Sequence, residues 1–232
     1  YPIDGYGNPE IIRSVLQKER PDVLWFMTDP RFYEWLWEME DEIRPLIPMV
    51  YYHVWDNFPA PVYNKAWYDS TDVIACISKV TEQVVREVAP DHKDICYLPH
   101  TVDTEIFKNH LNDLDKKQRR EEGFMTVDNI EDRTVFFWNN RNARRKQSGS
   151  LIYWFKAFLD EVGHDKATLL MHTDPKDPHG QDLEYIISHL GLDQGQIFLS
   201  RAKVSPEAMA EMYNMSDCTI SVSDAEGFGL AT

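Results

Sequence analysis

The sequence predicts an α/β fold in which two parallel-sheet domains follow one another along the chain. Apolar runs typical of buried strands alternate with segments of helical period, which is the pattern of parallel βαβ units. A charged stretch poor in apolar residues, from 108 to 132, interrupts this pattern, and the alternation restarts after it. We therefore expect one domain over residues 1–101 and a second over residues 102–232.

The first domain is expected to form half of a doubly wound layer. Its expected strands are 22–27, 48–52, 73–77 and 95–97, and its expected helices are 9–19, 31–43 and 79–88. In the segment 31–43, five apolar side chains recur on one helical face: Phe32, Trp35, Leu36, Met39 and Ile43. Together these segments predict a sheet of parallel strands joined by helical crossovers.

The second domain repeats the same alternation. Its expected strands are 134–138, 168–172, 196–199 and 217–222, and its expected helices are 150–162, 182–190 and 206–213. Ser205, Pro206 and Glu207 form a good helix start, because a hydroxyl cap, a proline at the first position and an early acid all suit a helix N-terminus.

Composition and charge indicate a globular protein and argue against some kinds of partner. The chain has 232 residues, and its hydrophobic content of 43% is enough for buried cores. A net charge of -15 opposes nucleic acid and anionic lipid as main partners, since both require a basic surface. No apolar run approaches the roughly 20 residues that a membrane-spanning helix needs, and we expect no secretory leader. We expect a cytoplasmic protein without a transmembrane segment, and peripheral attachment to a membrane stays open.

The chain has three widely spaced cysteines, at positions 76, 96 and 218. An odd number of cysteines in mostly strand-like sequence fits buried thiols in a reducing compartment better than disulfides or a zinc site.

The strongest chemical feature is the basic loop 139–147, which follows the first strand of the second domain. It carries four cations: Arg141, Arg144, Arg145 and Lys146. Open α/β sheets bind anionic ligands where a strand ends and a helix begins, so a diphosphate would fit here. We also expect free backbone amides near Ser148 and Gly149 to face the anion. A solvated basic loop is the alternative interpretation.

Two further segments carry polar groups at strand ends. Glu226, followed by residues 227–230, places a carboxylate and flexible backbone amides where sugar hydroxyls could be bound, although an acid that only complements a helix dipole is the alternative. His53 ends an apolar strand and enters a loop rich in aromatic residues, and a structural role for this histidine is the alternative there.

Several of these residues together resemble the GT-B glycosyltransferases of group 1, or family four, whose members retain configuration. The resemblance rests on four segments: Glu226-Gly227-Phe228-Gly229, Arg141 with Lys146 five positions later, Ile77-Ser78-Lys79-Val80-Thr81, and Pro99-His100-Thr101-Val102-Asp103 with Phe107. It extends from about His53 to residue 232. Asn140 and Thr101 stand where the family usually has glycine.

The resemblance implies two Rossmann-like domains in series: an acceptor-side domain over 1–101 that lacks its start, and a nucleotide-sugar-binding domain over 102–232 that lacks its second half. The chain would then be a fragment truncated at both ends. It implies transfer of a hexose-type sugar from a nucleotide sugar to a glycan, lipid or small-molecule acceptor, with no metal and no cofactor. Arg141 and Lys146 would stabilise the departing diphosphate, His53 would face the donor sugar, and Glu226 would bind its hydroxyls. The remaining donor-binding residues would be Asn140, Gly227, Phe228, Gly229 and Leu230.

Other functions remain as alternatives. A nucleotide-sugar epimerase, or a non-catalytic protein of the same fold that binds sugar nucleotides or glycans, would share much of this sequence pattern. Asp113-Leu114-Asp115 has the form of a metal-binding signature but lies in a charged helical stretch, and we interpret it as surface. For the chain as given, we expect neither activity nor full stability, because apolar strand faces would be exposed.

Overall fold

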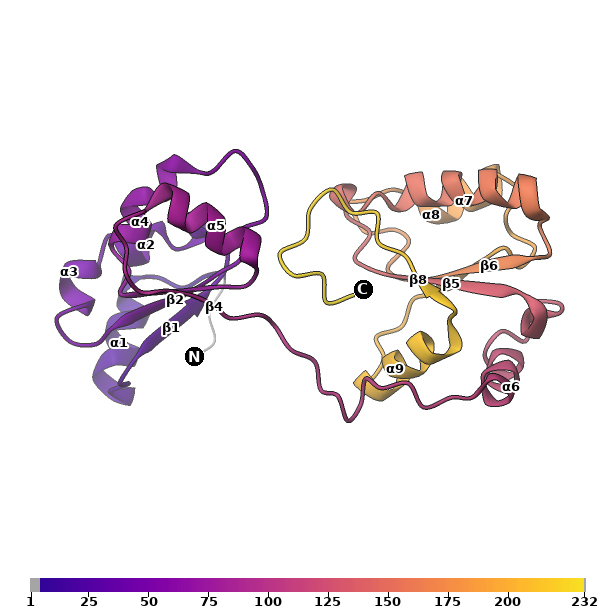
Figure 1. Cartoon of the computed structure of the whole chain (residues 1–232), viewed down its shortest axis with the longest axis horizontal. Coiled ribbons are helices and arrows are strands. Elements are labelled where there is room, and N and C mark those ends of the chain that lie inside the picture. Colours follow the sequence, from indigo (N-terminus) through magenta and orange to yellow (C-terminus); the bar gives the residue numbers. More distant parts are fainter. Residues whose placement is uncertain (1–4, 232) are drawn as a thin grey trace. The chain divides into compact units, whose positions relative to one another are not determined.

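The computed structural model describes residues 5–231, which form two compact units. The first contains the described residues up to Thr101 together with Glu226–Phe228. The second contains Val102–Ala225 and the described residues from Gly229 onward. Figure 1 follows the chain through both.

The first unit is built on a sheet of four parallel strands in the order β1-β2-β3-β4. The strands are β1 (Leu24–Met27), β2 (Met49–His53), β3 (Val73–Cys76) and β4 (Ile95–Tyr97). The helices are α1 (Pro9–Glu19), α2 (Glu34–Trp37), α3 (Glu40–Ile43), α4 (Lys65–Asp69) and α5 (Lys79–Val88). Successive strand residues face opposite sides. Accordingly Tyr51 and Ile74 enter the main core, whereas Tyr52 and Ala75 join a smaller cluster.

The continuous helix expected over 31–43 is wrong. The chain instead forms a 3-10 turn, Pro30–Phe32, and then the single-turn helices α2 and α3, because Tyr33 and Met39 leave the helical region with ψ of 18° and 9°. The breaks let Trp37 enter the core, where its indole N–H donates to Thr71 Oγ1 at 2.9 Å. A straight helix that buries Leu36, Met39 and Ile43 would point Trp37 away from them.

The second unit is a parallel sheet in the order β7-β6-β5-β8. Its strands are β5 (Thr134–Asn139), β6 (Ala167–His172), β7 (Ile197–Ser200) and β8 (Cys218–Thr219). Counted from the first strand of the unit, this order is 3-2-1-4, as in a doubly wound sheet, and the direction of winding reverses between β5 and β8. Only two residues of the expected strand 217–222 pair with β5.

Helices cover both faces of this second sheet. Helices α7 (Ser148–Val162) and α8 (Leu183–His189) lie on one face, and α6 (Asp113–Gly123) and α9 (Pro206–Met215) lie on the other (Figure 1). Because neighbouring residues of a strand alternate in direction, Trp138 enters the core under α7 while Val135 and Phe137 enter the opposite core. The predicted start of α9 is confirmed, since Ser205 Oγ accepts the amide of Ala208 at 3.3 Å.

The cysteine prediction is wrong for two of the three residues. Cys76 is buried in β3, but Cys96 and Cys218 are exposed, because the short strands that carry them direct these side chains outward. All three are free thiols. Within residues 5–231, the structure has no helix that combines the length and apolar character required to cross a bilayer.

Candidate functional site

A cavity of about 530 Å³ opens where β5, β6 and β7 end. Its lining comes from three consecutive strand ends, residues 139–141, 172–176 and 201–203. In parallel α/β sheets, ligands bind outside the carboxyl ends of the strands, and this cavity has that position. Among the described residues, the lining has four cations, Arg141, Lys176, Arg201 and Lys203, and one carboxylate, that of Asp174. The lining therefore favours an anionic ligand.

Part of this positive charge is offset just outside the cavity. Glu184 on α8 receives Lys176 Nζ at 2.8 Å and an Nη atom of Arg201 at 2.5 Å. The hydrogen bond from Lys176 is the main reason that the pKa of Glu184 lies below its ordinary value. Lys176 and Arg201 are therefore held in place by a shared carboxylate at the mouth of the cavity.

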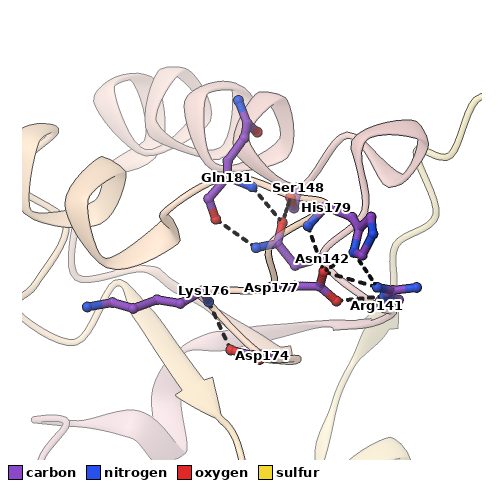
Figure 2. A network of polar contacts seen from close by, with 8 residues as sticks. All are labelled: Arg141, Asn142, Ser148, Asp174, Lys176, Asp177, His179 and Gln181. Atoms are coloured by element: carbon purple, nitrogen blue, oxygen red, sulfur yellow. Dashed lines mark hydrogen bonds and ion pairs between the residues drawn. The ribbon is translucent and has the colours of Figure 1, made fainter.

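Arg141 is held by a carboxylate of its own (Figure 2). Its Nε donates to one oxygen of Asp177 at 2.6 Å, and its Nη2 donates to the other at 3.1 Å. Nη2 also donates to Nδ1 of His179 at 2.8 Å. Asp177 accepts the backbone amide of His179 as well, at 2.9 Å. The guanidinium bond, followed by this amide, holds the pKa of Asp177 far below its usual range, so the pair stays charged.

Behind this pair, a buried network joins the loop after β5 to the loop after β6 (Figure 2). Asn142 has no exposed surface, and its Oδ1 accepts from Ser148 Oγ at 2.6 Å while its Nδ2 donates to the carbonyl of Gln181 at 2.7 Å. The amide of Gly149 donates to Gln181 Oε1 at 3.0 Å. The expectation of a free amide at Gly149 is therefore wrong, because a side chain already occupies the first turn of α7.

The two cations that the sequence singled out have different environments. The side chain of Arg141 is 60% exposed, whereas Lys146 is only 7% exposed and lies in the 3-10 turn Arg144–Lys146. Gln147 follows with a left-handed φ of 56°, so the tight turn falls there and not at Asn140, which lacks a positive φ. Asn140 itself lines the cavity.

The loop after β8 is hydrogen-bonded to the loop after β5, across the point where the sheet reverses. The amide of Asp224 donates to the carbonyl of Arg145 at 2.9 Å, and Arg145 Nη1 donates to the carbonyl of Ala225 at 2.5 Å. Gln147 Nε2 adds a bond of 2.8 Å to Asp224 Oδ1. The structure therefore brings together the basic loop and the residues that lead into Glu226.

The expected sugar-binding segment itself is divided between the units. Glu226, Gly227 and Phe228 group with the first unit, whereas Gly229 and Leu230 group with the second. Gly229 has a φ of 85°, a conformation that glycine adopts without strain. The donor-binding roles of all five residues stay predictions.

His53 lies at the end of β2 and has no exposed surface. Its Nε2 is 2.7 Å from the hydroxyl of Tyr68, and its ring packs against Tyr51 at 4.8 Å between centroids. Burial lowers the pKa of His53 to about 3, so the ring is neutral at pH 7. Its Nδ1 has no hydrogen-bond partner among residues 5–231. This environment is that of a core residue, and a role toward a donor sugar stays a prediction.

Sequence reasoning missed the residues that hold Arg141. Asp177, His179 and Gln181 belong to a loop that the proline-rich stretch 175–178 identifies only as the exit of a strand. Their importance follows from the pairing of β6 with β5, which places the two loops side by side. No group of three or more metal-ligating side chains is found in the part of the chain that the structure describes.

Comparison with known proteins identifies the fold. No family model matches the chain, and no curated protein matches its sequence. Solved structures do: a glycosyltransferase from Rickettsia africae matches with a TM-score of 0.68 and 17% identity, over 96% of this chain and 58% of its own. Anabaena HepE, in complex with UDP and glucose, matches with a TM-score of 0.71 and 12% identity over the same two shares.

A third match is the α,α-trehalose 6-phosphate synthase from Burkholderia multivorans, with a TM-score of 0.70 and 14% identity, over 94% of this chain and 54% of its own. The chain thus spans somewhat more than half the length of these proteins. Its fold is that of the GT-B glycosyltransferases, with two Rossmann-like parallel-sheet units in series, as the sequence predicted.

Proposed function

We propose that the chain belongs to a glycosyltransferase that moves a hexose from a nucleotide sugar to an acceptor, without a metal and with retention of configuration. The first unit would be its acceptor side, and the second unit would bind the donor. One observation carries the proposal: a cation-lined cavity lies at the carboxyl ends of β5, β6 and β7, beside a basic loop that is bonded to the loop after β8. The fold shared with glycosyltransferases supports the same conclusion.

The proposed roles follow from charge and position. Arg141 and Lys146 neutralise the charge that develops on the departing diphosphate, and stabilisation of developing charge is usually the largest single contribution to catalysis. Glu226 orients the sugar, with the backbone of residues 227–230 beside it, and Asn140 contributes to the donor cavity. The donor we propose is a uridine diphosphate sugar, because the structure of HepE contains UDP and glucose. The acceptor would be a glycan, a lipid or a small molecule in the cytoplasm.

Calorimetric titration of the chain with UDP and with UDP-glucose, in buffer containing a chelator, tests the proposal. Binding is the appropriate measurement because the chain spans just over half the length of the glycosyltransferases it resembles. Arg141→Ala and Lys146→Ala should each weaken UDP binding at least tenfold, since a charged hydrogen bond contributes about 1.5–3 kcal/mol.

The control is Lys156→Ala, which removes a cation paired with Asp160 on the outer part of α7. It should leave binding unchanged. If neither Arg141→Ala nor Lys146→Ala weakens binding, the proposed donor site is wrong. Binding that requires a divalent cation would contradict the metal-independent mechanism.

A further inference from the structure

The position of the Asp177 carboxylate is fixed by backbone contacts. The turn that carries it is closed by a bond of 2.9 Å from the amide of Gly180 to the carbonyl of Asp177. The carbonyl of His179 accepts the amide of Arg144 at 3.1 Å, which joins the turn to the basic loop. The Asp177 side chain is only 10% exposed. The carboxylate therefore has little freedom to follow Arg141, and Arg141 must adjust to the carboxylate.

The contacts of the guanidinium define what it can still bind. Nε and Nη2 are engaged by Asp177, and Nη2 is also engaged by His179. Within the described residues, Nη1 makes no hydrogen bond, and the side chain is 60% exposed beside the cavity. An arginine side chain has about 2 kcal/mol of rotamer entropy to lose when it is ordered. Here that ordering is already present before an anion arrives, which favours binding.

We propose that Asp177 is a positioning residue for anion binding: it orients Arg141 so that Nη1 faces a phosphate group of the ligand. This inference rests on the proposed function for the identity of the ligand, but its geometry concerns any diphosphate. The alternative is that Asp177 competes with the anion for Arg141, and it predicts the opposite change in affinity. A carboxylate that merely competed with the ligand for the guanidinium would weaken binding, and its removal would strengthen it.

A double-mutant cycle separates these cases. UDP and inorganic pyrophosphate are titrated into the 232-residue protein, Asp177→Ala, Arg141→Ala and the double variant. Asp177→Ala should weaken the binding of both probes about tenfold, and in the Arg141→Ala background the same change should alter affinity less than twofold. Tighter binding by Asp177→Ala, unchanged binding, or an equal loss in both backgrounds would each overturn the proposal.

A second measurement does not depend on a ligand. The Arg141 Nε–H resonance should be protected from solvent exchange in the wild type and lose this protection in Asp177→Asn, a variant of nearly unchanged shape. Asp160→Asn is the matched control, since Asp160 also pairs with a cation and a histidine, Lys156 and His164, but on the outer part of α7. It should change neither affinity nor the Arg141 resonance. Unprotected Arg141 in the wild type would contradict the proposed orientation.

The outcomes also separate this inference from the proposed function. If pyrophosphate binds with the expected coupling between Asp177 and Arg141 but UDP and UDP-glucose bind no better, the nucleotide-sugar function fails and the role of Asp177 stands. If UDP binds well but shows no coupling, the role of Asp177 fails alone. If the wild type binds none of the probes, both are overturned.

Discussion

Polar residues near the ends of β2 and β5 differ in burial and in hydrogen bonding, although both strands belong to parallel sheets of the same chain. His53, the last residue of β2, is fully buried among aromatic rings, and within residues 5–231 its ring makes one hydrogen bond, to Tyr68. Arg141, two residues past β5, is exposed and engages Asp177 and His179. Burial keeps the histidine neutral, whereas hydrogen bonding keeps the Arg141 pair charged.

This difference indicates where ligand chemistry can occur in the described structure. A buried neutral ring with a lowered pKa stabilises the core of the first unit but presents no group to solvent. An ordered, charged guanidinium beside a cavity can bind an anion without losing much entropy. Arg141 in the second unit can therefore bind an anion as it stands, whereas His53 in the first unit could do so only if it became exposed.

The largest expected effect comes from adding a methyl group to the network behind Arg141. A Cβ at position 180 would lie 2.0 Å from the carbonyl oxygen of Asn142. Gly180→Ala must therefore displace the backbone of one loop, at a cost of about 3 kcal/mol in the free energy of unfolding. Urea denaturation measures this loss, and anion affinity should fall with it because Asp177 moves.

Gly123→Ala is the matched control. A Cβ at position 123 would meet only Met215, with its sulfur at 3.6 Å, which is ordinary contact. Gly123 ends α6, where alanine costs little, so stability should change by less than about 1 kcal/mol. If the two variants lose equal amounts of unfolding free energy, the loops that follow β5 and β6 are not closely packed. The end of β5 would then differ less from the end of β2.

The second effect is a pH dependence that originates in the first unit. The pKa of His53 is about 3 in the folded state, because of burial, against an ordinary value of 6.5. The unfolded chain therefore binds the proton more readily, and stability that is complete above pH 6.5 is lost as the pH falls toward 3. The contribution of His53 should decrease by about 2 kcal/mol between pH 7 and pH 5. His53→Gln should lack this decrease.

His110→Gln provides a control of opposite sign. The hydrogen bond to Glu211 raises the pKa of His110, so its contribution is present below pH 6.5 and is lost as the pH rises through the folded pKa. Denaturation curves of the three proteins across this range separate the two histidines. A wild-type His53 resonance that titrates near pH 6.5 would contradict the buried neutral state and would restore a place for His53 in ligand binding.

Much of the fold could be predicted from the sequence, because local patterns determine it. Helices α1 and α5 and strand β4 have the predicted bounds, and every other expected strand is present with one or both ends at a different residue. The continuous helix predicted over 31–43 does not form, because Trp37 enters the core and contacts Thr71, a residue 34 positions away. Helical periodicity within the segment contains no information about such a partner.

The candidate site was predictable only in part, for the same reason. The basic loop could be found because four cations stand between a strand and a helix. Its restraints could not be found, since Asp177 and Gln181 follow a different strand and reach the loop only when β5 and β6 pair. The occupied amide of Gly149 is a direct consequence. Helix N-termini attract anions in general, but a glutamine side chain had no local reason to be expected there.

The smallest expected effect tests that occupied amide. Gln181→Ala removes the acceptor of the Gly149 amide and leaves the backbone contacts of residue 181 with Asn142 in place. Loss of one partly buried hydrogen bond should lower the free energy of unfolding by about 1 kcal/mol. Gln118→Ala, which removes an exposed bond to Glu122 on α6, should change it by less than about 0.5 kcal/mol.

The effect of Gln181→Ala on anion binding carries more information than its effect on stability. If Gln181 blocks the first turn of α7, its removal frees an amide at the positive end of the helix, and pyrophosphate should bind equally well or up to about threefold more tightly. If affinity instead falls tenfold, Gln181 itself contacts the anion. The anion would then lie against α7 and not beside Nη1 of Arg141. In that case the N-terminus of α7, and not the ordered guanidinium, would distinguish the end of β5 from the end of β2.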